Sequence, residues 1–489
     1  MRIAVIGGGT AGIAAAYELE QARAEGLAVE YTLFEARARL GGALASEVVD
    51  GAVLERGPDS FLTEKPAAAE LCRDLGLAAD LTPSNDARRK TWIVVGNRLV
   101  PLPDGLMFLV PTKLMPTALS PLFSLPTKLR MALELLHPPQ PSGEADVTVA
   151  ALVERHFGRE VVDRLADPLL SGIYGGDASQ LSARTVLPRL LQMESRYGSL
   201  TRGMLAAHRE MQARIKTAGG AQAAPPPIFT TLRGGMQQIV DVIEATLNPS
   251  WVRRSSPVSA VEKRADCWIV EQGGGVGAFD AVIVATPAWV AAELLARVDA
   301  ALAEELRGVP YSSSITVNLV YDESRLGRLP EGFGFLVPAI EGRALLACTF
   351  VHRKFLGRTP PGKAVLRAFL GGMRNEALLD ASDEQISATV RRELGEILGA
   401  AVFGAGVEPE HIQITRWPRT MAQYAVGHQE RKQRIAARVA GLSGLRLAGN
   451  AYDGIGVPDC IRLGRQAARE LVATGTLSTR AAEPLGRSR

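Results

Sequence analysis

The chain is poor in the residues that build disulfides and metal sites. Its 489 residues include four cysteines, Cys72, Cys267, Cys348 and Cys460, which lie far apart with no C-x-x-C spacing. Its six histidines form no H-x-x-x-H pair. These absences argue against a disulfide framework and against a zinc centre. We therefore expect four reduced, mostly buried thiols and no metal.

A strong excess of one charge is also missing. The 55 basic and 52 acidic residues are spread along the chain and leave a net charge of +3, which argues against a nucleic-acid partner. No run reaches about 18 uncharged apolar residues, the length of a membrane-spanning helix, and no secretion signal opens the sequence. We expect a cytoplasmic protein. At 489 residues and 47% hydrophobic composition, it is long enough for two or more domains with a large core.

The chain opens with MRIAVIGGGTAGIAAAYELEQ, in which a predicted strand over 1–6 and a predicted helix over 11–19 flank a glycine-rich turn. Gly7, Gly9 and Gly12 fit the pattern G-x-G-x-x-G. In this pattern the glycines allow a tight turn, the approach of a pyrophosphate and close packing of helix on strand. The phosphates would lie at the helix N-terminus, where N–H groups are free. The pattern predicts a dinucleotide site, and it fits NAD as well as FAD.

The loop after the next strand distinguishes the two cofactors. VEYTLFE ends at Glu35, about 20 residues past the last glycine, where a ribose hydroxyl needs an acceptor. Arg39 and the pair Gly41-Gly42 follow in EARARLGGA and can fold over the same pyrophosphate. This loop resembles that of the amine oxidase-like flavoprotein superfamily, whose cofactor is FAD. QGGGVGA lies between two strand patterns and predicts a hairpin, so no second nucleotide domain is evident and an oxidase is favoured over a reductase.

Five longer segments indicate which family within this superfamily the chain resembles. GPDSFLTEK, DPLLSGIYGGDASQLS, GFGFLVP, TRWPRTMAQYAVGHQERKQRI and AGNAYDGIGVPDCI resemble the oxygen-dependent protoporphyrinogen and coproporphyrinogen oxidases of haem biosynthesis, across nearly the whole chain. The resemblance implies oxidation of coproporphyrinogen III to coproporphyrin III, or of protoporphyrinogen IX to protoporphyrin IX. Six electrons would pass in three cycles through noncovalent FAD to molecular oxygen, giving hydrogen peroxide. It also implies a hand-over of the porphyrin to the next haem-pathway enzyme.

The same resemblance assigns the cofactor site. The loop ERGPDSF would lie beside the isoalloxazine, Val258 would touch the adenine, and backbone amides of NAYDGIGVPDC would face the flavin pyrimidine, where negative charge gathers on reduction. The residues expected to bind FAD are Gly7, Gly8, Gly9, Thr10, Ala11, Gly12, Glu35, Ala36, Arg39, Gly41, Gly42, Ala43, Gly57, Pro58, Asp59, Ser60, Val258, Asn450, Ile455, Gly456 and Val457.

Four positions match substrate-binding positions of the resembled family. Gly172 matches a place where backbone approaches the ring, and Leu336 and Phe369 match slot-lining residues, although Phe369 also fits a plain sheet core. Lys65 matches a lysine of the coproporphyrinogen-oxidising members and would bind a propionate, or it is an ordinary surface lysine. Met107 stands about where some protoporphyrinogen-oxidising members carry arginine, which favours coproporphyrinogen. No general base is assigned.

The fold implied is α/β (α+β). A Rossmann-like FAD-binding domain would comprise 1–64, 228–300 and 440–475, an antiparallel-sheet substrate domain 301–439, and a helical, membrane-leaning insertion 65–220, followed by a tail at 476–489. The apolar, proline-broken segment near 104–136 forms a surface that contacts the inner face of the cell membrane peripherally or gates the substrate, or else it is buried in a domain interface. Two alternatives stay open: an amine or carotenoid oxidase or desaturase of the same superfamily, and a catalytically inactive flavoprotein that serves as a binding partner.

Overall fold

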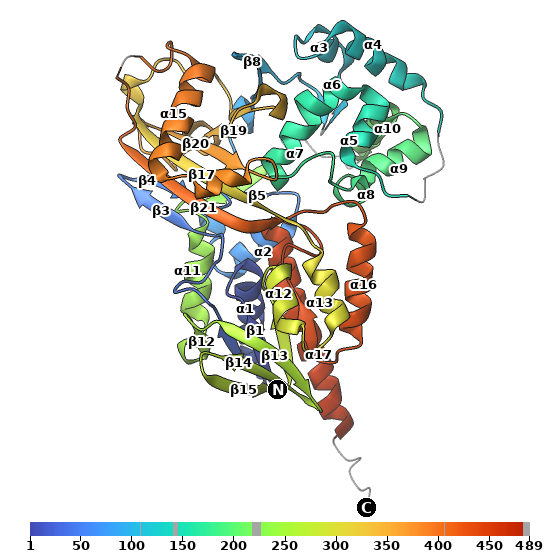
Figure 1. Ribbon diagram of the computed structural model, residues 1–489, viewed down its shortest axis with the longest axis vertical. Coiled ribbons are helices and arrows are strands. Elements are labelled where there is room, and N and C mark those ends of the chain that lie inside the picture. Colours follow the sequence, from blue (N-terminus) through green and yellow to red (C-terminus); the bar gives the residue numbers. More distant parts are fainter. Residues whose placement is uncertain (108, 140–144, 218–225, 405, 483–489) are drawn as a thin grey trace, which may run out of the picture.

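The computed structural model describes residues 1–107, 109–139, 145–217, 226–404 and 406–482. Two layers of structure meet across the middle of the molecule (Figure 1). The half that carries both termini is built on a parallel sheet, and the other half combines a large, mostly antiparallel sheet with a group of helices.

The parallel sheet joins strands from three distant parts of the chain. Across the sheet they are β12 (Val252–Arg253), β2 (Glu30–Phe34), β1 (Arg2–Ile6), β16 (Ala281–Val284) and β22 (Leu445–Leu447). The predicted strand over 1–6 and helix over 11–19 are confirmed as β1 and α1 (Thr10–Ala24). The predicted hairpin at QGGGVGA is confirmed as the turn between β14 (Cys267–Gln272) and β15 (Gly275–Phe279), which pair with β13 (Val258–Arg264).

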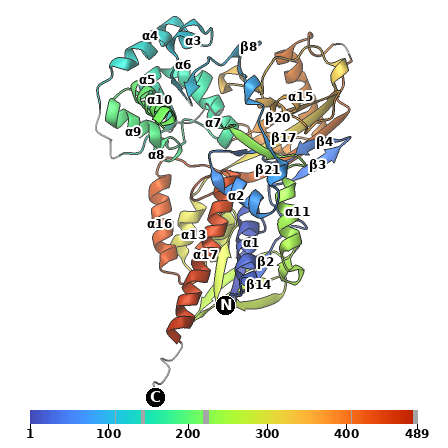
Figure 2. The ribbon, with the colours of Figure 1, turned by 180° about the vertical axis from the view of Figure 1, so that it is seen from behind.

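Both faces of this sheet are covered. Because side chains alternate along a strand, Ile3 and Val5 point to one face and Ala4 and Ile6 to the other. The first face packs under α1, α2 (Pro66–Asp74), α11 (Gln237–Thr246) and α17 (Val457–Ala482), which lie together in Figure 2. The second packs under β13 to β15 and the helices α12 (Ala288–Leu295), α13 (Ala300–Arg307) and α16 (His428–Ala440).

The second sheet has seven strands. In order they are β21 (His411–Ala422), β17 (Tyr311–Asp322), β20 (Lys363–Gly371), β19 (Leu345–Phe350), β18 (Gly334–Leu336), β7 (Thr91–Val95) and β8 (Arg98–Pro101). All neighbours are antiparallel except β18 and β7. Helix α15 (Asp383–Leu398) buries Ile386, Val390 and Leu394 against one face. α14 (Val351–Lys354) follows β19.

The prediction of a helical insertion over 65–220 is wrong for its first part. β7 and β8 extend the large sheet, and β6 (Leu81–Pro83) pairs with β11 (Phe229–Leu232), which also pairs with β5 (Phe61–Leu62). The run TWIVV in β7 is rich in aromatic and β-branched residues, which favours a strand. The prolines on either side of it are typical of interrupted helices and led to the wrong prediction. Two further pairs are short: β3 (Ser46–Val49) with β4 (Ala52–Glu55), and β9 (Leu106–Met107) with β10 (Val110–Pro111).

Helices make up the remainder of the insertion. They are α3 (Leu114–Leu119), α4 (Leu125–Leu133), α5 (Val149–Phe157), α6 (Arg159–Val161), α7 (Asp167–Tyr174), α8 (Ala183–Val186), α9 (Pro188–Tyr197) and α10 (Leu200–Thr217). A π-helical turn over Val162–Ala166 leads into α7. Such turns are frequent at functional sites.

A buried histidine joins four of these elements. His156 Nδ1 lies 3.0 Å from Glu134 and its Nε2 lies 2.9 Å from Glu194. Glu134, fully buried just after α4, also accepts hydrogen bonds from Ser199 Oγ and from the backbone at the start of α10. Burial opposes a charge on His156, but the hydrogen bonds that its ring donates to the two carboxylates outweigh burial and raise the pKa of this histidine. The helices are thus tied together by one ionic cluster.

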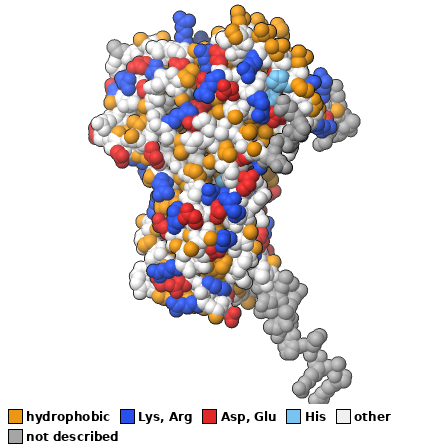
Figure 3. All heavy atoms as spheres, turned by 45° about the vertical axis from the view of Figure 1, so that its right-hand side comes forward, with side chains coloured by type: hydrophobic (Ala, Val, Ile, Leu, Met, Phe, Trp, Pro, Cys, Tyr) orange, Lys and Arg blue, Asp and Glu red, His pale blue; other side chains and the backbone are white. Residues whose placement is uncertain are grey.

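The surface of α3 and α4 is apolar. Seven large side chains in this stretch are at least 46% exposed and form the surface visible at the top of Figure 3: Leu114, Met115, Leu119, Leu125, Leu129, Leu133 and Leu136. Among the residues that the structure describes, no helix has the length and apolarity to cross a membrane.

Two smaller expectations have clear outcomes. The predicted tail at 476–489 is helical as far as Ala482, because α17 continues to that residue, and 483–489 lie outside the described residues. All four cysteines are free thiols, as predicted, and Cys72 and Cys348 are buried.

Candidate cofactor and substrate site

The turn between β1 and α1 has the geometry that the glycine pattern predicts. A Cβ on Gly12 would lie 1.7 Å from the carbonyl oxygen of Gly7, and Gly7 itself has a φ of +102°. Gly9 differs, because a Cβ there would meet no atom within 4 Å. No side chain caps the first turn of α1. Free N–H groups at a helix N-terminus beside open space suit a pyrophosphate.

Three of the loops expected to bind FAD stack on one another. Gly41 N–H donates to the Gly8 carbonyl at 2.7 Å, and Gly42 lies against Gly9, where an added Cβ would be 3.0 Å from the Gly9 Cα. On the far side, a Cβ on Gly57 would lie 2.0 Å from the carbonyl oxygen of Ala43. The loop at 41–43 is therefore held between the first glycine turn and the loop at 57–60, and backbone atoms make the shortest contact on each side.

Glu35 and Arg39 bond mainly to backbone. The Glu35 carboxylate accepts hydrogen bonds from Gly8 N–H at 2.7 Å and from Arg37 N–H at 2.8 Å. The Arg39 guanidinium donates to the carbonyls of Leu40 and Leu44 at 2.9 and 3.0 Å, and to Gly42. Arg39 thus shapes its own loop, and its contact with a pyrophosphate stays a prediction.

Two later segments of the chain approach these loops. The first contains Val258, which begins β13 and lies two residues after Ser256, whose N–H donates to the Glu35 carbonyl. The second is the C-terminal segment. Tyr424 OH donates to the carbonyl of Asn450 and accepts from Gly454 N–H, which fixes the loop before α17. α17 packs directly on α1, because a Cβ on Gly464 would lie 2.0 Å from the Ala11 carbonyl oxygen. Val457 is the first residue of α17, directly after Ile455 and Gly456, and this helix lies beside α1.

Lys65 is paired with an acid that the sequence analysis missed. Its Nζ lies 2.6 Å from Asp459 Oδ2, in the first turn of α17. The Lys65 side chain is 40% exposed, whereas that of Asp459 is 9% exposed and also accepts from Gly456 N–H at 3.2 Å. The cation predicted to meet substrate thus lies beside the segment predicted to face the flavin.

Two of the expected substrate residues, Leu336 and Phe369, lie on one face of the large sheet, and Gly172 packs against it. The strand register places Leu336 opposite Ala347, Ala347 opposite Phe369, and Phe369 opposite Thr316. Opposed residues on neighbouring strands point to the same face. A Cβ on Gly172, in α7, would lie 3.4 Å from Leu336 Cδ2. We refer to Leu336, Ala347, Phe369 and Gly172 as the apolar row.

The apolar row faces the loop at 56–60. Thr316, in line with Phe369, donates its Oγ1–H to the Arg56 carbonyl at 2.7 Å, and Trp417 Nε1–H donates to the same oxygen at 2.7 Å. Phe369 is only half-buried, so part of its ring is available to a ligand. An apolar sheet face over a glycine-containing loop can accept a flat, apolar molecule.

A group of buried charges underlies that loop and was also missed by the sequence analysis. Lys354 Nζ lies 3.0 Å from Asp59 Oδ2, and Arg367 Nη1 lies 3.6 Å from the same oxygen. Burial opposes ionisation of Asp59, but the charges of Lys354 and Arg367 outweigh it and hold its pKa well below the ordinary value. The sequence feature that could have indicated these buried charges is Arg367, a cation within the apolar strand AVLRAFL.

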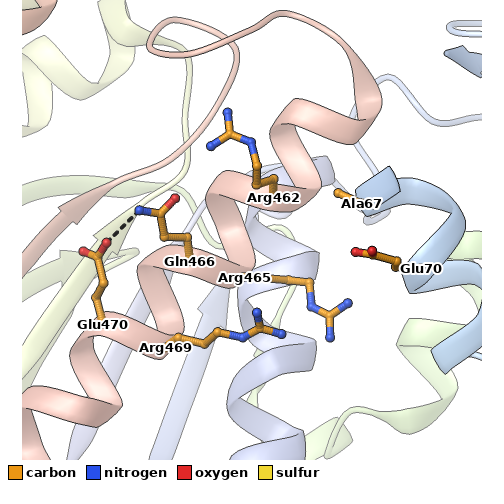
Figure 4. A pocket seen from close by; sticks show the side chains of 7 residues that line it. All are labelled: Ala67, Glu70, Arg462, Arg465, Gln466, Arg469 and Glu470. Carbon is orange, nitrogen blue, oxygen red and sulfur yellow. Dashed lines mark hydrogen bonds between the residues drawn. The ribbon is translucent and has the colours of Figure 1, made fainter. Parts of the chain in front are cut away.

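A separate cavity of about 300 Å³ lies between α2 and α17 and is shown in Figure 4. Three arginines line it, but each already has a carboxylate partner: Arg462 bonds to Asp453, Arg465 to Glu18 and Asp74, and Arg469 to Glu18. With its cations paired, this cavity offers little to an anionic ligand. Among the described residues, no group of three or more His, Cys, Asp or Glu could hold a metal ion.

Known proteins and a family model match this chain over nearly its full length. The family model described as flavin containing amine oxidoreductase matches residues 10–472. The chain is 34% identical to the coproporphyrinogen III oxidase of Bacillus subtilis, over 95% of this chain and 96% of the relative. It is 29% identical to the chloroplastic protoporphyrinogen oxidase of Nicotiana tabacum, over 91% and 81%. A crystal structure of a candidate protoporphyrinogen oxidase from Exiguobacterium superposes with a TM-score of 0.84 at 31% identity, covering 97% and 99%.

The open space at Gly9 gives a sharp test of the cofactor site. Gly9→Asp should fold, since a Cβ at this position meets no protein atom within 4 Å, but it should weaken FAD binding by about a hundredfold or more, because placing like charges together costs several kcal/mol. Titration of the apoprotein with FAD measures this. The neutral isostere Gly9→Asn should lose much less. Wild-type affinity in Gly9→Asp would contradict the assignment of the pyrophosphate to this turn.

Proposed function

The chain belongs to the flavin-containing amine oxidoreductase family, and we propose that it oxidises a porphyrinogen, preferentially coproporphyrinogen III, to the porphyrin in haem biosynthesis. The observation that carries this proposal is the apolar row, which faces the loop at 56–60 and suits a large, flat ring. Relatives 34% and 30% identical over nearly the full chain are named coproporphyrinogen III oxidase.

We propose FAD, held noncovalently, as the flavin. The stacked glycine loops and the uncapped start of α1 fit its pyrophosphate. Cys460, in the first turn of α17, is the cysteine nearest the segment expected to face the ring, and burial raises its pKa to about 12. A thiol that stays protonated is a poor nucleophile, so covalent attachment is not expected. Bound FAD would accept two electrons in each of three cycles and pass them to molecular oxygen, giving hydrogen peroxide.

The protein's own residues would bind and orient the substrate. Leu336 and Phe369 would hold the macrocycle against the loop at 56–60 and exclude water from it. Gly172 would let α7 approach the ring without a side chain. The N–H groups of Ile455 and Val457 would stabilise negative charge on the cofactor, while the N–H of Gly456 donates to Asp459. Release of the porphyrin to the next enzyme of the pathway is part of this proposal.

The direct test is turnover of purified, FAD-loaded protein with coproporphyrinogen III and oxygen, without any nicotinamide. We expect fluorescent porphyrin and about three molecules of peroxide for each porphyrin formed, since six electrons leave in pairs. Without oxygen, formation of porphyrin should stop when the flavin is reduced. Activity on an amine or carotenoid with none on either porphyrinogen would support the superfamily alternative, and bound FAD that no porphyrinogen bleaches would indicate a catalytically inactive binding protein.

Lys65 tests the choice of porphyrinogen. A propionate bound by Lys65 forms a charge-assisted hydrogen bond, so Lys65→Ala should lower kcat/KM for coproporphyrinogen by about tenfold to a hundredfold. Protoporphyrinogen, with two propionates instead of four, should lose less if Lys65 serves one of the two that it lacks. Asp459→Asn is the matched control, because it removes the partner of Lys65 and keeps the ammonium. Equal losses on both substrates, or none, would contradict a selective contact.

We also propose that the exposed face of α3 and α4 contacts an anionic lipid surface peripherally. Seven large apolar side chains are exposed there, and from residue 105 to residue 133 the sequence carries Lys113, Lys128 and Arg130 but no acid. An apolar face with basic residues is typical of helices that lie at the membrane interface.

Sedimentation with vesicles containing phosphatidylglycerol tests this contact. Two leucines of the face are 77% and 63% exposed, and the double variant Leu119→Asp, Leu129→Asp should weaken binding by about tenfold or more, since a buried leucine contributes about 1.5–3 kcal/mol. Leu356→Asp changes a leucine that is 62% exposed elsewhere and should bind normally. Binding of the double variant equal to wild type would refute the proposal.

A further inference from the structure

Five buried charges lie beneath the loop expected to meet the flavin. Two are carboxylates, on Glu55 and Asp59, and three are cations, on Lys354, Arg358 and Arg367. They come from β4, the loop after it, α14, the turn after α14, and β20. All five side chains are at most 13% exposed. Counted together, they leave one positive charge in excess.

The first part of this cluster is a balanced pair. Arg358 is fully buried and donates from Nη2 to Glu55, and its Nη1 donates to Thr231 Oγ1 at 3.0 Å. Glu55 also accepts from Met236 N–H at 2.8 Å and from Ser46 Oγ–H at 2.7 Å. One carboxylate therefore matches one guanidinium, and this pair ties β4 to the start of α11.

The second part is unbalanced. Asp59 faces both Lys354, at 3.0 and 3.1 Å, and Arg367, at 3.6 Å. Arg367 also donates from Nη2 to the Gly57 carbonyl, and its Nε has no partner among the residues that the structure describes. The neighbouring Arg56 is paired with Glu47 at 2.7 Å and adds no net charge. The excess charge is thus located at Lys354 and Arg367.

This position is next to the expected reaction site. Arg367 and Phe369 are two residues apart on β20, so both point to the face that carries the apolar row. The guanidinium carbon of Arg367 lies 4.9 Å from the centre of the Phe369 ring. Burying an unmatched cation is costly, and a neutral side chain could fill the same space. The protein retains a buried cation here despite the free-energy cost. A negative charge that arises nearby during the reaction would explain why.

Building on the proposed function, we propose that Lys354 and Arg367 are positioning residues whose excess positive charge stabilises the negative charge that bound flavin acquires on reduction. Two electrons and one proton pass from the substrate to the cofactor, which leaves one negative charge there, and the second proton of the substrate goes to water. Asp59 sets the size of the effect by neutralising one of the two cations. The cluster would thereby raise the reduction potential of the flavin.

The test is the two-electron midpoint potential of the FAD-loaded protein, measured by anaerobic equilibration with a reference dye and no porphyrinogen. At a fixed potential, Lys354→Met should lower the ratio of reduced to oxidised flavin about tenfold, a shift of about 30 mV for a two-electron couple. Asp59→Asn should raise the ratio about tenfold. The double variant Lys354→Met, Asp59→Asn restores the net charge and should return near wild type.

The opposite signs separate electrostatics from damage to the fold, which would move all variants the same way. Arg343→Met is the matched control, because Arg343 is an 11% exposed arginine paired with Glu396 of α15, on the far face of the sheet, and it should leave the potential unchanged. If Lys354→Met does not retain FAD, the midpoint potential of Asp59→Asn alone still tests the proposal. Shifts of one sign, or below twofold, would overturn the proposal. Because no porphyrinogen is used, a wrong substrate assignment would leave this result intact.

Discussion

Close approach of backbone to backbone is the constraint on which the rest of this structure depends. Gly12 lies on Gly7, Gly42 on Gly9, and Gly57 on Ala43. At each contact a single methyl group would meet main-chain atoms at 3.0 Å or less, and main chain cannot rotate away as a side chain can. Three loops from different parts of the first 60 residues are thereby pressed into one surface around the uncapped start of α1.

The large sheet complements that surface. Its outer face is closed by α15, and its inner face presents the apolar row to the loop at 56–60. Hydrogen bonds from Thr316 and Trp417 to the Arg56 carbonyl set the spacing between sheet and loop. Neutral contacts therefore form the walls of the site, while the charges of Asp59, Lys354 and Arg367 lie behind the loop, away from water. Charges in such surroundings act more strongly than on the surface.

The sequence predicted those parts of the molecule that depend on local rules. The glycine turn and the hairpin at 272–278 follow from spacing and composition within a few residues, and the antiparallel sheet expected over 301–439 is found there as β17 to β21. It did not predict that β7 would join the far edge of the large sheet, since this depends on β18, which lies more than 200 residues away. The Lys65–Asp459 pair and the Asp59 cluster were missed for the same reason, because each links residues about 300 or more positions apart.

The order of strands in the parallel sheet has a consequence for how the chain is made. β1 spans Arg2–Ile6, but its neighbour β16 follows about 280 residues later, and β22 and α17 lie more than 400 residues after β1. Until they arrive, β1 has an unpaired edge and α1 has an uncovered apolar side. Folding dominated by such distant pairings is slow and exposes strand edges to aggregation. The cofactor site can therefore be completed only once α17 has been synthesised, and until then the N-terminal half keeps an open strand edge and an uncovered helix face.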